Sequence, residues 1–114
     1  MDDRKIKNHI LRIMKKLKVG SYFIDCSYEP CIVTAKGFSY QDLYGAWVDG
    51  KSLVSDSETS CSIMHCGPEP IDKDKADEMI AEYKKGGSRA LVIKYGGWSE
   101  EDYDAFEKKW RKDA

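Results

Sequence analysis

The central block of the chain, residues 20–71, consists of short runs of β-branched and aromatic residues separated by turn residues. Runs of this kind, bounded by Gly, Pro, Asn or Asp, are typical of β-strands. Several in succession predict an antiparallel meander, and short antiparallel strands tend to close or curl because free edges are a liability. The block therefore predicts a small curled antiparallel sheet or an SH3-like barrel of four or five strands.

Turn residues divide the block into its expected strands. The Asp49-Gly50 pair predicts a type I′ hairpin turn, because both central residues of that turn need a positive φ. Such a turn would place Val48 opposite Lys51. Residues 55–60 are polar and acidic, which is typical of a surface loop. The strands are expected at residues 21–27, 31–35, 43–48 and 61–66.

An amphipathic helix is expected before this block, over residues 3–18. Asp2 or Asp3 can cap its first turn, because a carboxylate accepts hydrogen bonds from free backbone N–H groups there. Gly20 suits its end, because glycine readily adopts the left-handed conformation that stops a helix. One apolar stripe is formed by Ile6, Ile10, Ile13, Met14 and Leu17.

After the block, the sequence predicts a helix, a strand and a second helix. Asp72 can cap a helix that runs to about residue 85. Residues 89–95 are the most β-like run in the chain, and we expect a strand there that rejoins the sheet. Ser99 can cap the last helix, with Trp98 and Tyr103 placed to form a hydrophobic staple.

These patterns predict one α+β domain over residues 1–114, with a basic amphipathic helix at 1–19, a strand-rich core at 20–71 and a helix–strand–helix segment at 72–114. The chain has no apolar run near the roughly 20 residues of a membrane-spanning helix. It also has no signal-peptide pattern. We therefore expect a cytoplasmic protein with reduced thiols, export being the alternative.

Two Cys-x4-Cys pairs lie at the ends of the central block: Cys26 with Cys31, and Cys61 with Cys66. Four thiolates match the ligands of a structural zinc site. However, residues an odd number apart on a strand point to opposite faces, so each pair would diverge. Reduced cysteine also packs as a small apolar residue. We expect buried thiols and neither metal nor cofactor; zinc is one alternative, and a disulfide or reactive thiol another.

Catalysis is not favoured by the residues present. The histidines are His9, on the first helix, and His65, whose neighbour Cys66 would point to the opposite face of a strand. Nucleophilic catalysis needs a thiol within reach of an oriented base. No two of the many carboxylates stand out as a pair, and the glycine pairs form no phosphate-binding pattern. We expect a protein that is not an enzyme.

Charge is unevenly distributed along the chain. Residues 1–20 have a net charge of +5, residues 21–71 of −5 and residues 72–114 of −1. Lys15, Lys16 and Lys18 at the end of the first helix are candidate contacts to an anion or to nucleic acid. The acidic sheet and the lack of a recognition motif weigh against nucleic acid, which we keep as the alternative partner.

Aromatic residues gather in the stretch from Tyr40 to Trp47. Tyr and Trp are favoured at interfaces, because they bury a large surface at little cost in side-chain freedom. We take Tyr40, Tyr44 and Trp47 as the candidate partner-binding residues, although they would also serve in a core. The function expected is a small non-catalytic binding protein, acting as a regulator, adaptor or inhibitor of another protein. The alternatives are a nucleic-acid-associated protein and a small structural zinc protein.

Overall fold

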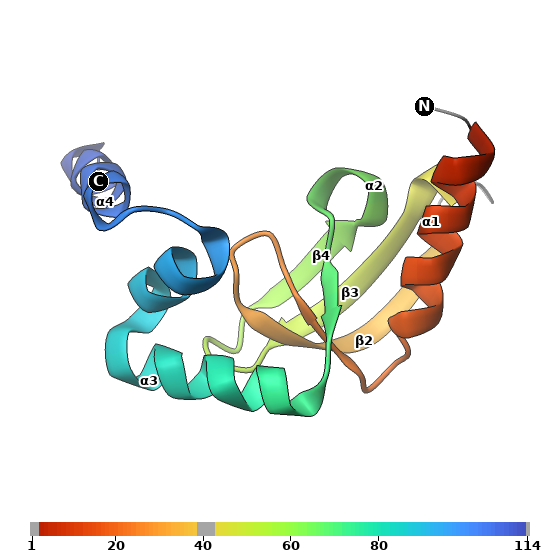
Figure 1. The fold of residues 1–114 in the computed structure, drawn as a ribbon, viewed down its shortest axis with the longest axis horizontal. Coiled ribbons are helices and arrows are strands. Elements are labelled where there is room, and N and C mark those ends of the chain that lie inside the picture. The colour runs from red at the N-terminus through yellow and green to blue at the C-terminus, as the bar shows by residue number, and fades with distance from the viewer. Residues whose placement is uncertain (1–2, 39–42, 114) are drawn as a thin grey trace.

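Five antiparallel strands form an open sheet in the computed structural model, which describes residues 3–38 and 43–113. The strand order is β4-β3-β2-β1-β5, so β4 and β5 are the two edges. Helices pack on this sheet, and the α+β class is thus confirmed (Figure 1). The sheet does not close into a barrel, so of the two predicted forms the structure has the open sheet. The strands are β1 Tyr22–Ile24, β2 Pro30–Phe38, β3 Ala46–Ser52, β4 Glu58–Ser62 and β5 Glu69–Ile71.

The predicted hairpin turn at Asp49-Gly50 is wrong, because both residues lie inside β3. Gly50 pairs with Val33 of β2, and the chain reverses only after the strand ends. A Cβ atom at position 50 would lie 2.6 Å from the ring of Phe23. This glycine is therefore explained by close packing against a buried aromatic ring, which a turn signal cannot reveal.

Other strand limits also differ from those expected. β2 continues past residue 35 to Phe38, and a short 3₁₀ helix, η2 Leu43–Gly45, precedes β3. The predicted strand at 61–66 is wrong for four of its six residues, since β4 ends at Ser62 and one helical turn, α2 Ile63–Cys66, follows. The loop expected at 55–60 is shorter, because β4 already begins at Glu58.

The N-terminal helix, α1 Asp3–Lys16, packs its apolar stripe on one face of the sheet, as predicted. Gly20 follows with a φ of +90°, a conformation that favours glycine. The buried core between α1 and the sheet contains Ile10, Met14, Leu17, Phe23, Cys31, Val33, Ala46, Val48, Cys61 and Ile63. Burial of this apolar surface fixes the position of α1.

Residues 89–95 are helical, so the predicted strand there is wrong. They belong to α3 Lys73–Gly96, which Asp72 caps through a 2.8 Å hydrogen bond from the Lys75 backbone N–H. At Gly87, with φ 65° and ψ −156°, the helix breaks, and its second half folds back beside the first. Two helical halves joined at Gly87 are therefore found where a helix followed by a strand was expected.

A second apolar cluster holds α3 to the sheet. Ile24 of β1 is the neighbour of Phe23 but points away from the α1 core, as alternation along a strand requires. It packs with Met79 from the first half of α3 and Leu91 from the second half. In the run at 89–95 only Leu91 is buried and the other apolar side chains are partly buried, and an apolar composition does not by itself select a strand.

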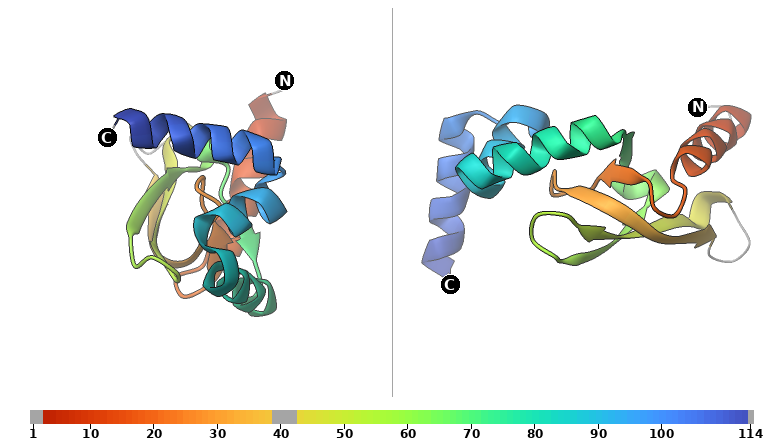
Figure 2. Two further views of the ribbon diagram at one scale, coloured as in Figure 1. Left: turned by 90° about the vertical axis from the view of Figure 1, so that its left-hand side faces the viewer. Right: turned by 90° about the horizontal axis from the view of Figure 1, so that it is seen from below.

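The last helix, α4 Glu100–Asp113, begins as predicted, with the Asp102 backbone N–H donating a 3.0 Å hydrogen bond to the Ser99 hydroxyl. Trp98 packs edge-to-face on Phe106, with ring centroids 5.6 Å apart. α4 and α1 lie at opposite ends of the molecule (Figure 2). No helix among the described residues is long and apolar enough to cross a membrane.

Candidate functional site

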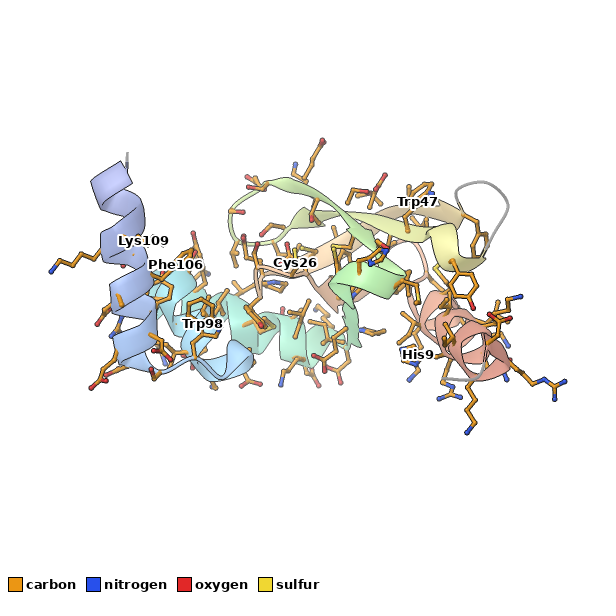
Figure 3. The ribbon with its side chains drawn as sticks, turned by 90° about the horizontal axis from the view of Figure 1, so that it is seen from above. His9, Cys26, Trp47, Trp98, Phe106 and Lys109 are labelled. Atoms are coloured by element: carbon orange, nitrogen blue, oxygen red, sulfur yellow. The ribbon has the colours of Figure 1, made fainter. Side chains whose placement is uncertain are left out.

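Trp47 lies on the side of the sheet opposite to α1 (Figure 3). It shares this side of β3 with Asp49, while the alternate residues Ala46 and Val48 are buried in the α1 core. The pairing of β3 with β4 places Ser62 beside Trp47 and Ser60 beside Asp49. This part of the sheet therefore presents one aromatic side chain among polar ones.

The Trp47 ring lies against the backbone of Gly37, its partner on β2. A Cβ atom at position 37 would be 2.8 Å from the ring, so only glycine leaves room for this arrangement. The indole remains half-buried, with part of its surface open to solvent. Trp47 is thus neither a core residue nor a freely moving surface residue, and a ring held in this way is already oriented for a partner.

The ring forms part of the wall of an open hollow of about 630 Å³. Tyr44 of η2 lines it, and its hydroxyl donates a hydrogen bond to the Asp3 carboxylate of α1, which fixes the side chain. His65, exposed on α2, forms another part of the wall. We call this the Trp47 hollow, lined by Tyr44, Gly45, Ala46, Trp47, Asp49, Ser60, Ser62 and His65.

The structure brings two of the three predicted partner-binding residues together. Tyr44 and Trp47 line the same hollow, whereas Tyr40 lies outside the described residues. Sequence reasoning missed His65, Ser60 and Ser62. Their place in the hollow depends on the β3–β4 register and on the helical turn after β4, neither of which the local pattern predicts.

The hollow adjoins an edge of the sheet. β4 is one of the two edge strands, and among the described strands it pairs with β3 alone. An edge strand carries backbone N–H and C=O groups that another extended segment can bind. A partner segment lying along β4 would have a side chain within reach of the Trp47 hollow, because Ser60 and Ser62 belong to both.

The predicted anion contacts lie elsewhere. Lys15, Lys16 and Lys18 are all exposed at the end of α1, the helix that packs on the face of the sheet opposite to Trp47. Residues 4–20 contain no acidic residue that could neutralise them locally. The basic and aromatic candidates therefore form two separate surfaces.

The cysteines divide into a buried and an exposed member in each pair. Cys31 and Cys61 are buried in the α1 core, whereas Cys26 and Cys66 are exposed. The strand argument for this division is wrong, because Cys26 lies in a turn and Cys66 in α2. Two of the four cysteines are therefore buried thiols, the state that was expected for all four. In the described part of the chain, no three or more His, Cys, Asp and Glu residues are grouped so that they could hold a metal ion.

The pKa of three of the thiols is raised in this setting. Burial raises the pKa of Cys31 and Cys61, and it also raises the pKa of Cys26 with help from the neighbouring Cys66. The reactive form of cysteine is the thiolate, and a raised pKa lowers its population at neutral pH.

Asp25 is a buried carboxylate that the sequence analysis did not single out. Its Oδ1 accepts hydrogen bonds from the backbone N–H groups of Ser27 at 2.9 Å and Glu29 at 3.0 Å, and so holds the turn between β1 and β2. Burial raises the pKa of Asp25, although these two hydrogen bonds act against the shift. An Asp two residues before a serine is the available signal, since Asp often bonds to a backbone N–H two residues on.

Searches of protein-family models, of curated protein sequences and of solved structures gave no match to this chain. The function must therefore be argued from the site.

Proposed function

We propose that this chain is a small non-catalytic protein-binding domain, a regulator, adaptor or inhibitor that binds a segment of another protein at the Trp47 hollow. The observation that carries the proposal is the half-buried Trp47 ring, held against Gly37 in an open hollow. Large aromatic side chains supply much of the binding energy at protein interfaces. Because the ring is oriented beforehand, little side-chain freedom is lost on binding.

The lining of the hollow indicates which segments fit. Ser60 and Ser62 provide hydroxyl groups, and Asp49 provides a carboxylate beside the indole. The central block also carries a net charge of −5, which disfavours phosphate groups. The proposed ligand is an extended segment that pairs with the edge of β4, places an apolar or aromatic side chain against Trp47 and a basic side chain near Asp49.

The raised pKa values of Cys26, Cys31 and Cys61 support a binding role over thiol catalysis. Asp25, the buried carboxylate, already has its Oδ1 engaged in holding a turn. A cytoplasmic location belongs to the same proposal, because the exposed thiols of Cys26 and Cys66 would stay reduced there.

The test is affinity capture from the host with tagged wild-type protein, Trp47→Ala and a matched control, Phe38→Ala. Phe38 is also an exposed aromatic residue, on β2, but it does not line the hollow. We expect proteins that wild type and Phe38→Ala retain and Trp47→Ala loses. With the purified partner, Trp47→Ala should weaken the Kd at least tenfold, the loss of about 1.4 kcal/mol or more. Equal capture and affinity for all three proteins would refute the proposal.

A second candidate is a nucleic-acid-associated function of α1. The specific observation is the exposure of Lys15, Lys16 and Lys18 at the end of a helix whose residues 4–20 lack acidic residues. Neutralised phosphates release counterions, so binding should weaken as salt is raised. The triple change of these lysines to Glu should abolish binding to DNA and RNA at low salt, whereas Trp47→Ala should not. No binding by the wild type at low salt would exclude this candidate.

A further inference from the structure

Cys26 and Cys66 come from different Cys-x4-Cys pairs but meet at the surface. Cys26 follows Asp25 in the turn between β1 and β2, and Cys66 ends α2. Both line one hollow of about 280 Å³, together with Ile24, Asp25, Tyr28, Gly67, Glu69 and Tyr95. Cys66 is also near enough to contribute to the raised pKa of Cys26. Two segments 40 residues apart thus bring their thiols to the same hollow.

Both thiols are accessible, and both lie on backbone that can adjust. Cys26 and Cys66 are exposed, whereas Cys31 and Cys61 are enclosed in the core. Cys26 lies in a turn, and Cys66 is followed by Gly67 in the left-handed conformation at the end of a four-residue helix. A disulfide requires a particular Cβ–S–S–Cβ geometry, and short irregular segments reach it with less distortion than strands in mid-sheet.

We propose that Cys26 and Cys66 form a dithiol–disulfide site, which low-molecular-weight disulfides such as glutathione disulfide convert to an intramolecular disulfide. One cysteine thiolate attacks a sulfur of glutathione disulfide, giving a mixed disulfide and releasing one glutathione thiolate. The other cysteine then attacks the protein sulfur of that mixed disulfide and releases the second glutathione. Two protein thiols lose two electrons, one disulfide gains them, and the two cysteine protons pass to the glutathione thiolates.

The surroundings of the pair set the conditions for this reaction. Burial, Cys66 and the Asp25 carboxylate raise the pKa of Cys26. Glu69 and Tyr95 line the same hollow and carry no positive charge, while Lys75 and Lys94 lie over the Tyr95 ring. The thiolate of Cys26 is therefore disfavoured at neutral pH, and its attack on a disulfide should become faster as pH is raised.

The experiment treats the reduced full-length protein with glutathione disulfide at pH 7 to 9. We expect the free thiols to fall from four to two, and peptide mapping to find Cys26 joined to Cys66. Cys26→Ser and Cys66→Ser should each instead accumulate a mixed disulfide with glutathione on the remaining exposed thiol. A shifted-thiol control, Cys26→Ser with Ser27→Cys, moves the thiol by one residue and should form no intramolecular bond. Circular dichroism confirms that each variant is folded.

Stable mixed disulfides on both Cys26 and Cys66 of the wild type, with no bond between them, would overturn the proposal. So would an intramolecular bond that forms equally well in the shifted-thiol control, since the position of the thiols would then not matter. A bond between Cys31 and Cys61 would overturn it as well, by showing that the enclosed pair is the oxidised one.

Discussion

Two regions of the molecule, the body and the C-terminal arm, are stabilised by different interactions. The body, residues 3–38 and 43–72, is built around the α1 core, where Phe23, Ile10 and Leu17 are completely buried. The C-terminal arm, residues 73–113, buries Ala76, Met79 and Leu91 of α3, and no described residue of α4. Burial therefore determines the form of the body, whereas the arm depends more on its helix caps, on Gly87 and on surface ion pairs.

The ion pairs of the arm connect segments that the glycine break brings together. Lys94 bonds to Glu78 and Glu82 across the fold of α3, at 3.2 Å each. Arg89 bonds to Asp104 of α4 at 3.2 Å. All these groups are partly or largely exposed, and exposed pairs stabilise little. Because exposed ion pairs stabilise less than buried apolar contacts, the arm should unfold locally far more easily than the body.

The largest expected contrast is between two phenylalanines. Phe23→Ala should lower the free energy of unfolding by about 3–5 kcal/mol, because it leaves a cavity below Gly50 in the α1 core. Phe106→Ala, which truncates a side chain that is 46% exposed, should cost less than about 1 kcal/mol. Urea unfolding of both variants measures the contrast. Similar losses would mean that α4 is as firmly packed as the core.

A smaller effect is expected at the break in α3. Gly87 has φ 65° and ψ −156°, a region that residues with a Cβ atom rarely adopt. Gly87→Ala should cost about 1–3 kcal/mol and should speed amide hydrogen exchange across residues 88–96. Ser88→Ala, at the next, exposed position, is the control and should change neither. Unchanged exchange in Gly87→Ala would show that the break does not depend on the glycine.

The smallest effects concern pH, and they have opposite signs in the two regions. Because burial raises the pKa of Asp25, the fold favours its protonated form, and this stabilisation is lost as pH rises through the folded-state pKa. In the arm, hydrogen bonds from Lys94 and Tyr95 lower the pKa of Glu78, so its contribution is lost as pH falls. Asp25→Asn and Glu78→Gln should each remove one of these trends.

Urea midpoints measured from pH 3 to 7 provide the comparison. Relative to wild type, Asp25→Asn should gain stability as pH rises, and Glu78→Gln should gain it as pH falls. Parallel curves for wild type and both variants would show that neither carboxylate titrates differently in the folded and unfolded states.

Local sequence patterns gave correct predictions where one type of residue has one structural role, such as an apolar helix face or a helix cap. The stripe from Ile6 to Leu17 predicted α1, and Asp72 and Ser99 predicted helix caps that the structure confirms. The helix and the caps depend on neighbours within about four residues, which a sequence displays directly. One cysteine of each pair is buried and the other exposed, but not through alternation along one strand, since Cys26 lies in a turn and Cys66 in α2.

Predictions failed where a distant contact overrode the local signal. Gly50 resembles a turn residue, but it makes room for the ring of Phe23 from another strand. Residues 89–95 resemble a strand, but Gly87 and the buried position of Leu91 keep them helical. In both cases the local preference is worth less than the packing that competes with it.

The sequence by itself determined the α+β class, the first helix, the caps and the choice of Tyr44 and Trp47 as candidates. Only the tertiary structure decided that the Trp47 ring lies against Gly37, that β4 is an edge strand beside it, and that Cys26 and Cys66 line one hollow. The physical reason is the same each time. These features join residues from separate strands and helices, and their meeting depends on sheet order and register rather than on any local pattern.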